Sequence, residues 1–222
     1  MSFHHEVCGP VELWFTEADA GDLRDAETLD RVAGLAGVEA VATMKQVHGP
    51  DVAWAGEPRA HDAVDALLTD RTGLGLLVRV ADCVPIVLAA PDDGIVGVVH
   101  SGRAGLVGDV VPTAVAALRE RASGPLHAWL GPRVCGGCYE LPVELAEDVA
   151  AAVPEARSTT TQGTPAADIG AGAAAQLRAA GVEVHDVGAG ACTVEDERFF
   201  SYRRQGDASG RFGALAVLRG AR

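Results

Sequence analysis

The chain has 222 residues, enough for one domain with a sizeable core, and its 18 basic and 31 acidic residues give a formal net charge of −13. A chain this acidic lacks the basic surface on which nucleic acid or an anionic membrane would bind, so neither is an expected partner. The 48% hydrophobic content excludes intrinsic disorder. No apolar run approaches the roughly 20 residues of a membrane-spanning helix, and the first residues carry no signal-peptide pattern, so we expect a cytoplasmic location.

Short apolar runs, separated by turns rich in glycine, proline and aspartate, predict strands throughout the first half of the chain. The sequence Pro91-Asp92-Asp93-Gly94 lies between two such runs and predicts a hairpin turn. The predicted strands span residues 11–15, 38–43, 63–69, 75–80, 85–90 and 95–100.

Helices and strands alternate less regularly in the second half. Pro112 has to lie in the first turns of its helix or kink it, Pro142 opens a second helix, and Gly181 closes a third. Strands that dominate one half and mix with helices in the other indicate an α+β fold. The predicted helices span 107–121, 142–153 and 166–180, the surface loop 158–165, and the late strands 182–187, 199–202 and 212–218.

The chain has five cysteines, an odd number, which together with the missing export signal favours free thiols or metal ligands over structural disulfides. Cys135 and Cys138 form a C-x-x-C pair around two glycines. A structural zinc needs two further ligands that the local sequence does not supply. We therefore interpret this pair as a tight, glycine-rich turn with reduced or loosely paired thiols.

Three residues with the chemistry of metal ligands lie at the ends of predicted strands: His48, Cys83 and His100. Strand ends are rigid supports that face loops, where sites tend to form. Each residue taken alone could equally be a buried core side chain. Two imidazoles and one thiolate together suit zinc, and three protein ligands leave a fourth position open, as in catalytic sites. The sequence therefore predicts that these three side chains converge on one ion.

The segments around these residues resemble the YfiH-like laccase-domain family, once called multicopper polyphenol oxidases and now associated with purine nucleoside phosphorylase activity. The resemblance runs in family order from about residue 40 to the C-terminus and identifies residues 1–222 as a single catalytic domain of this kind. The matching stretches are Gln46-Val47-His48-Gly49, Asp65-Ala66-Leu67-Leu68-Thr69, Ala81-Asp82-Cys83-Val84-Pro85, His100-Ser101-Gly102, Gly131-Pro132 through Tyr139-Glu140, Gln176-Leu177 and Phe200-Ser201-Tyr202-Arg203-Arg204.

The resemblance implies a four-layer αββα sandwich with mixed sheets, shared with certain cysteine-dependent toxin domains. It implies that His48, Cys83 and His100 are the catalytic residues and the zinc ligands, with copper as the second choice of metal. The implied activities are phosphorolysis of adenosine, inosine, guanosine and methylthioadenosine, and deamination of adenosine. The implied partners are a purine nucleoside and inorganic phosphate, and the protein is expected to be a monomer or a small homo-oligomer.

Phosphorolysis requires an anion site, and in an acidic protein that site has to be locally basic. The candidate substrate-binding residues lie in the family-like segments: Lys45, Gln46, Asp65, Asp82, Arg103, Arg203 and Arg204. Asp82, beside Cys83, is a candidate to orient a metal ligand, and a structural role in a turn is the alternative. The same two alternatives to substrate binding apply to Asp65. One departure from the family is clear. Its usual Gly-Trp-Arg-Gly reads Gly102-Arg103-Ala104-Gly105 here, so the tryptophan is missing and the arginine stands one position earlier.

Other functions remain open at this point. Cys83 with a histidine base would suit a metal-independent amidase that edits peptidoglycan precursors. A non-catalytic binding module is a further possibility. A multicopper oxidase is disfavoured, because it needs many imidazoles, usually as His-x-His pairs, and the chain has seven histidines and no such pair.

Overall fold

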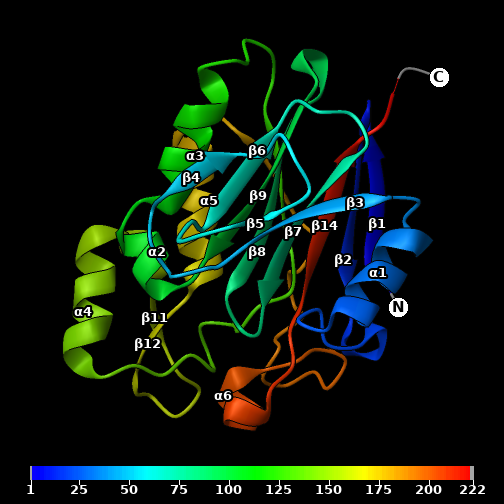
Figure 1. Ribbon diagram of the computed structural model, residues 1–222. Coiled ribbons are helices and arrows are strands. Elements are labelled where there is room, and N and C mark those ends of the chain that lie inside the picture. The colour runs from blue at the N-terminus through cyan, green and yellow to red at the C-terminus, as the bar shows by residue number, and fades with distance from the viewer. Residues whose placement is uncertain (1, 221–222) are drawn as a thin grey trace.

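The computed structural model describes residues 2–220 and consists mainly of two six-stranded mixed sheets that pack face to face (Figure 1). The first sheet has the order β1-β2-β14-β7-β3-β5, formed by Ser2–Cys8, Val11–Thr16, Phe212–Leu218, Leu74–Val80, Ala40–Met44 and Ala60–His61. The second sheet has the order β13-β10-β8-β9-β6-β4, formed by Glu183–Asp186, His127–Leu130, Val84–Ala90, Ile95–Ser101, Ala66–Thr69 and Val52–Trp54. A separate small hairpin joins β11 (Arg157–Thr159) to β12 (Pro165–Ala167).

Helices cover the outer faces of both sheets and complete four layers, which confirms the predicted αββα sandwich (Figure 1). Helix α1 (Ala26–Leu35) covers the first sheet. The opposite side carries α2 (Arg103–Val107), α3 (Val110–Arg119), α4 (Val143–Ala152) and α5 (Ile169–Ala179). The short helix α6 (Tyr202–Gln205) lies at one end of the sandwich.

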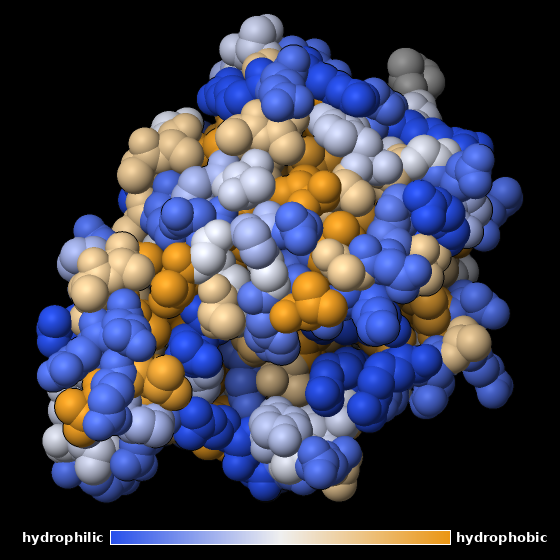
Figure 2. All heavy atoms as spheres, turned by 60° about the vertical axis from the view of Figure 1, so that its left-hand side comes forward, coloured by the Kyte–Doolittle hydropathy of each residue, from blue (hydrophilic) through white to orange (hydrophobic). Residues whose placement is uncertain are grey.

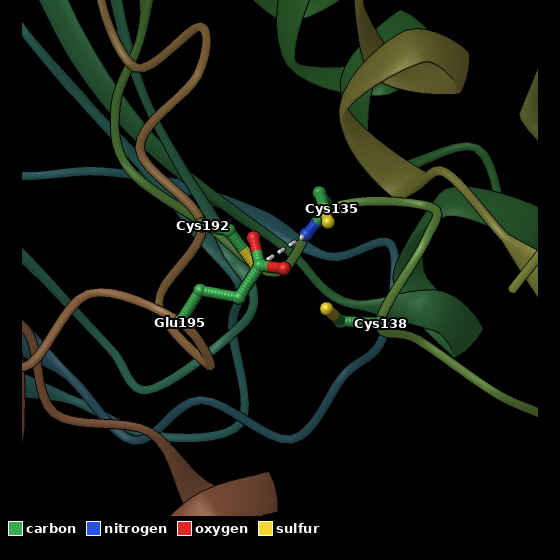
Figure 3. A group of neighbouring side chains, drawn as sticks. All are labelled: Cys135, Cys138, Cys192 and Glu195. Atoms are coloured by element: carbon green, nitrogen blue, oxygen red, sulfur yellow. Dashed lines mark hydrogen bonds between the residues drawn. The ribbon is translucent and has the colours of Figure 1, made fainter. Parts of the chain in front are cut away.

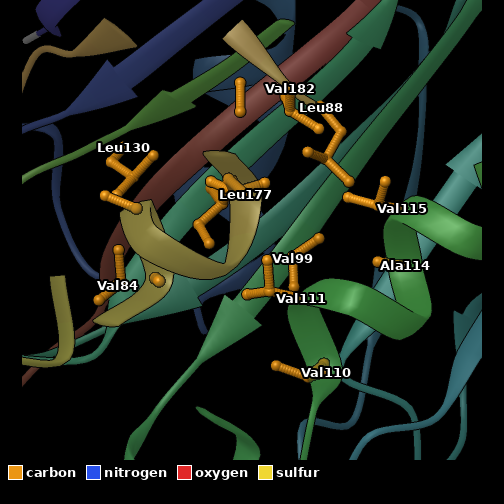
Figure 4. Close-up of a cluster of buried hydrophobic side chains, with 14 of the residues drawn as sticks. Val84, Leu88, Val99, Val110, Val111, Ala114, Val115, Leu130, Leu177 and Val182 are labelled. Carbon is orange, nitrogen blue, oxygen red and sulfur yellow. The ribbon is translucent and has the colours of Figure 1, made fainter. Parts of the chain in front are cut away.

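Side chains alternate between the two faces of a strand, so each sheet packs against the other sheet on one face and against helices on the other. In β14, Ala214 and Ala216 face the other sheet, whereas Leu215 and Val217 face α1. Because both faces are covered, β8, β9 and β14 are buried along their whole length. Figure 4 shows the core between the second sheet and its helices, with valines of α3 and Leu177 of α5 over the strands. These buried strands hold the loops at their ends rigidly.

Local sequence signals located most of the strands. The predicted hairpin turn joins β8 to β9, with Gly94 in the left-handed region at φ 63°, which glycine adopts without strain. The predicted strands at 11–15, 38–43, 75–80, 85–90, 95–100, 182–187 and 212–218 are confirmed, with small shifts of their ends. Helix α1 and strands β1, β4, β5 and β10 were not predicted.

Several other boundaries differ from the prediction. The strand expected at 199–202 is wrong: Ser201 caps α6 by accepting a hydrogen bond from the backbone of Arg204. The helix expected at 107–121 is α3, which begins only at Val110, because Asp109 adopts φ 63° and separates it from α2, which was not predicted. The helix expected from 166 begins at Ile169, after its cap Asp168. Pro142 is the N-cap of α4 rather than its first residue.

The predicted strand 63–69 shortens to Ala66–Thr69, and the loop expected at 158–165 is largely the turn of the β11–β12 hairpin. The face that carries the outer helices is mostly hydrophilic, with hydrophobic residues scattered among charged ones (Figure 2). Among the helices of residues 2–220, none is long and apolar enough to cross a membrane.

Candidate functional site

Three loops and strand ends bring His48, Cys83 and His100 together. His48 follows β3, Cys83 lies between β7 and β8, and His100 is near the end of β9. Their ligand atoms all lie within 4.8 Å of one another. Cys83 Sγ lies 3.7 Å from Nε2 of His48, and the two imidazole rings have centroids 4.7 Å apart. Side chains distant in the sequence therefore form one compact group, which we call the trio.

Asp65 supports the trio from the interior of the fold. Its side chain is fully buried, and Oδ1 lies 2.7 Å from Nδ1 of His100. The carboxylate also accepts backbone hydrogen bonds from Val47, His48 and Gly49 at 2.8–3.0 Å. His48 adopts φ 61°, which helps to turn these successive N–H groups toward one anion. One carboxylate therefore orients both histidines of the trio.

Asp65 was a candidate for substrate binding, and its contacts favour the alternative role of orienting a metal ligand. A side chain with no exposed surface and with both oxygens hydrogen-bonded inside the fold cannot contact a ligand. Burial by itself raises the pKa of Asp65, but the hydrogen bonds from His100 and from the loop backbone lower it below its usual value. The carboxylate therefore stays ionised and holds a proton on Nδ1 of His100.

Electrostatics make Cys83 and His100 an ion pair when no metal is bound. Burial would raise the pKa of Cys83, but the positive charge of His100 and hydrogen bonds from His100 and His48 lower it to about 6. Burial likewise would lower the pKa of His100, but the Cys83 thiolate and the hydrogen bond to Asp65 raise it to about 9. At neutral pH the thiol is therefore deprotonated, as a metal ligand or a nucleophile requires.

Gly102 has no side chain, and this leaves room for the side chains of His48 and Cys83 beside it. A Cβ atom built on this residue would lie 2.6 Å from Cδ2 of His48 and 2.9 Å from Sγ of Cys83, both closer than real contacts. Gly102 has extended backbone angles, so the requirement is for space and not for an unusual conformation. The glycine after His100-Ser101 is thus part of the architecture of the site.

The trio faces a pocket of about 460 Å³. Charged and aromatic side chains join it there from several parts of the chain. The lining residues are Gln46, His48, Arg79, Val80, Ala81, Asp82, Cys83, His100, Tyr139, Tyr202, Arg203 and Arg211. A neighbouring hollow of about 290 Å³ shares Gln46, Arg79 and Arg211 with this pocket and adds Arg24, Met44 and Lys45. Positive charge is therefore concentrated locally in an acidic protein.

Of the other predicted site residues, some line the pocket and others lie beside it. Arg203 lines the pocket, and its guanidinium carbon lies 4.6 Å from the centre of the Tyr139 ring. Gln46 lines it too, and its amide group pairs with the backbone N–H and C=O of Arg79. Lys45 is exposed and lines the neighbouring hollow. Arg103 begins α2 directly after Gly102.

Two predicted substrate-binding residues are engaged within the fold. The Arg204 guanidinium donates hydrogen bonds to four backbone carbonyls, those of residues 193, 194, 196 and 199. Asp82 accepts hydrogen bonds from the Thr193 hydroxyl at 2.6 Å and from the Arg203 backbone at 2.7 Å. The hydrogen bonds of Arg204 favour a structural role for this side chain, which clamps a loop, over substrate binding. Asp82 holds the start of α6 beside the pocket through its two contacts.

Sequence reasoning missed four residues of the pocket wall: Arg79, Arg211, Tyr139 and Tyr202. A signal was present for Arg79, because it is the one charged residue in β7, whose other residues are all buried. Arg211 precedes β14 and offers no comparable signal. Both tyrosines lie in segments that carry the family resemblance, but nothing in their local pattern marks them as pocket residues.

Two more groups of possible metal ligands occur in the described part of the chain. One joins Cys135 and Cys138 to Cys192 and Glu195, and the other joins His127, Glu183 and His185. The C-x-x-C segment forms the predicted tight turn, in which the backbone N–H of Cys138 donates to the carbonyl of Cys135. All five cysteines are free.

Comparisons with known proteins give a consistent result. Residues 20–219 match the family described as multi-copper polyphenol oxidoreductase laccase. A purine nucleoside phosphorylase of Streptomyces coelicolor is 48% identical over 170 residues, covering 74% of this chain and 69% of the relative. A protein of the same name from Corynebacterium glutamicum is 37% identical over 198 residues, covering 86% of this chain and 80% of that relative.

Solved structures share the fold along almost the whole chain. YlmD from Geobacillus stearothermophilus has a TM-score of 0.84 at 26% identity, covering 95% of this chain and 93% of that one. A Neisseria meningitidis protein has a TM-score of 0.82 at 26% identity and covers 96% of both chains. YfiH of Bacillus licheniformis, at 23% identity, has a TM-score of 0.80 and covers 94% of this chain and 93% of its own.

Proposed function

This chain belongs to the multi-copper polyphenol oxidoreductase laccase family, and from that premise we propose that it is a purine nucleoside phosphorylase. The proposed reaction cleaves the ribosidic bond of adenosine, inosine, guanosine or methylthioadenosine with inorganic phosphate. Relatives up to 48% identical carry the name purine nucleoside phosphorylase. The observation that carries the proposal is the trio, whose ligand atoms lie within 4.8 Å of one another at the edge of a pocket that also contains arginines.

We propose zinc as the metal and His48, Cys83 and His100 as its ligands. The donor set of two imidazoles and one thiolate fits zinc, and the Asp65–His100 hydrogen bond is the partner that a metal-bound imidazole typically has on its other nitrogen. Bound zinc would supply Lewis-acid chemistry at the pocket. A copper oxidase fits less well, because the axial methionine of a blue-copper site is not available from Met44, which is buried between the sheets.

Arginines of the pocket form the proposed phosphate site. Arg79, Arg203 and Arg211 all line it, and guanidinium groups bind phosphate oxygens in a fixed, two-pronged geometry. In phosphorolysis these cations hold the phosphate and orient it toward the sugar carbon while positive charge develops on the ribose. Lys45 lines the neighbouring hollow and the charge of Arg103 acts on Tyr139, so both add to the local positive potential.

The purine side of the pocket is proposed to lie along the tyrosines. Burial raises the pKa of Tyr139, so its hydroxyl stays protonated and can donate a hydrogen bond to the departing base. Arg203 holds the Tyr139 ring through its cation–π contact. Tyr202, half exposed at the rim, offers an aromatic face to the substrate.

The test is release of free base and ribose 1-phosphate from inosine and adenosine, with and without inorganic phosphate. We expect phosphate-dependent release by the wild type and loss of release in His48→Ala, Cys83→Ala and His100→Ala. His5→Ala and Cys8→Ala serve as matched controls, because both residues belong to β1, outside the pocket lining. Full turnover in any trio variant would remove that residue from the catalytic role, and no phosphate-dependent release by the wild type would overturn the proposal.

Deamination of adenosine is proposed as a second activity of the same pocket, on the basis of the family resemblance. Zinc deaminases require a metal-activated water and a group that moves protons. The assay is formation of inosine from adenosine in phosphate-free buffer. Absence of inosine under conditions where phosphorolysis proceeds would restrict the enzyme to bond cleavage with phosphate.

One observation favours a second candidate function. Asp65, His100 and Cys83 form a chain of carboxylate, imidazole and thiolate, which is the arrangement of a cysteine hydrolase. Such an enzyme would act on an amide bond, as in the editing of peptidoglycan precursors. Chelation distinguishes the two mechanisms. Amide hydrolysis that survives complete metal removal and is lost in Cys83→Ser would favour the thiol mechanism over the zinc-dependent one.

A further inference from the structure

A second cluster of thiols lies outside the pocket, where two turns meet. Cys135 and Cys138 belong to the turn after β10, and Cys192 and Glu195 belong to the turn after β13. Each turn presents two ligand residues with two residues between them, C-x-x-C and C-x-x-E. The backbone N–H of Cys138 donates to Cys135, and that of Glu195 to Cys192, so each pair is curled back on itself. This spacing in a tight turn is typical of zinc-binding knuckles.

The four side chains converge on a common space. Three sulfurs and one carboxylate oxygen all lie within 4.8 Å of one another, and Figure 3 shows them pointing toward the same centre. Ligands around a tetrahedral zinc with Zn–S bonds of about 2.3 Å lie roughly 3.8 Å apart, so only small movements are needed to close the site. Cys192 is 5% exposed, and its sulfur accepts a hydrogen bond of 3.4 Å from the backbone N–H of Cys135.

We propose that Cys135, Cys138, Cys192 and Glu195 bind a structural zinc ion, distinct from the trio. Four protein ligands close the coordination sphere, whereas the three ligands of the trio leave a position open, which is the difference between structural and catalytic zinc. The backbone N–H that points at the Cys192 sulfur stabilises a thiolate in that position. The C-x-x-C pair alone lacks two ligands, and the fold supplies them from the second turn.

The position of this site gives it a role in shaping the pocket. Tyr139, which lines the pocket, directly follows Cys138. Thr193, which directly follows Cys192, donates a 2.6 Å hydrogen bond to the Asp82 carboxylate next to Cys83. Zinc bound between the two turns therefore fixes the loop that carries Tyr139 relative to the loop that anchors Asp82.

Metal content of full-length variants tests the proposal without reference to any activity. His48→Ala/Cys83→Ser removes two of the three trio ligands, and after loading with zinc and desalting it should retain about one zinc per chain. Cys135→Ser/Cys138→Ser should also retain about one, and the combination of all four substitutions should retain none. Cys8→Ser is the control for loss of an unrelated thiol. A folded trio variant that holds no zinc overturns the proposal, even if Cys135→Ser/Cys138→Ser fails to fold.

Cobalt provides a second readout of the ligands. Co²⁺ added to His48→Ala/Cys83→Ser should give intense thiolate-to-metal charge-transfer absorption, because three thiolates remain, together with the visible bands of a tetrahedral ion. Glu195→Gln should keep that absorption and weaken zinc affinity by roughly 10-fold or more in competition with a chromophoric chelator, whereas Glu197→Gln, two residues further on, should change neither. Absence of the charge-transfer band, or a thiol titration that reveals a disulfide among the three cysteines, contradicts a zinc site.

Discussion

Asp65 lies 2.7 Å from Nδ1 of His100 and at the same time gathers the backbone N–H groups of the loop that carries His48. The two histidines come from distant parts of the chain, and a single buried carboxylate sets the position of both. The roles of the residues in the site follow from these contacts. Asp65 positions the two histidines, and the side chains that line the pocket are the ones that can contact a substrate.

Asp65→Asn should therefore lower kcat/KM for phosphorolysis by roughly 10- to 100-fold, the usual effect of losing the partner of a ligating histidine. The amide keeps the size of the side chain, but its NH₂ group faces N–H donors instead of accepting from them. Steady-state kinetics and zinc affinity measure the effect. Asp70→Asn, at an exposed position, is the matched control. Wild-type values for Asp65→Asn would show that the carboxylate does not support the site.

Gly102→Ala should impair zinc binding and activity, because the added Cβ would lie 2.6 Å from His48 and 2.9 Å from Cys83. The extended backbone at this position tolerates alanine, so the melting temperature should change far less than the zinc affinity. Gly34→Ala is a suitable control, since a Cβ on Gly34 meets nothing within 4 Å and alanine favours the helix. If Gly102→Ala binds zinc as the wild type does, the space beside the trio is larger than the contacts imply.

Metal-stripped protein should show an unusually acidic thiol at Cys83. Its pKa of about 6 means that thiolate is lost as the pH falls through 6, and the pKa of about 9 for His100 means that the imidazolium partner is lost as the pH rises through 9. The ion pair therefore exists between these limits. Residue-specific alkylation, followed by mass spectrometry, should give a midpoint near pH 6 for Cys83.

Cys8 provides an internal comparison in the same samples, because burial and nearby carboxylates raise its pKa and its alkylation needs a higher pH. His100→Ala should move the midpoint of Cys83 upward, since the largest lowering influence on its pKa is removed. A midpoint near 9 for Cys83 in the otherwise unchanged protein is the result that would speak against the ion pair.

The neighbours Arg203 and Arg204 should respond differently to truncation. Arg203→Ala should raise the KM for phosphate or nucleoside, because this side chain lines the pocket and contacts Tyr139. Arg204→Ala should lower the free energy of unfolding by roughly 2 kcal/mol or more, because it leaves several backbone carbonyls without their donor. Thermal unfolding and kinetics on both variants separate the two effects. Equal stability of the two variants would contradict the clamp role of Arg204.

Local sequence patterns predicted most of the strands. The β8–β9 hairpin followed from a turn of proline, aspartates and glycine between two apolar runs, since the turn and its strands are neighbours in sequence. Local patterns do not predict helix α1, and they predict a strand at 199–202 that does not form. An apolar pair such as Phe199-Phe200 satisfies a strand pattern, but here Ser201 begins a helix one residue later, and the capping hydrogen bond decides the outcome.

The sequence by itself determined the α+β class, the resemblance to the laccase-domain family and the choice of His48, Cys83 and His100 as a set, because these depend on residue types and their spacing. Only the tertiary structure decided which charged residues face the pocket. Arg79 joins it from β7 and Arg211 from the residue before β14, and these two strands pair in the sheet. Arg204 instead donates to backbone carbonyls, and Cys192 meets Cys135 across two turns. Such contacts depend on how strands far apart in the chain are paired, and no local pattern encodes that pairing.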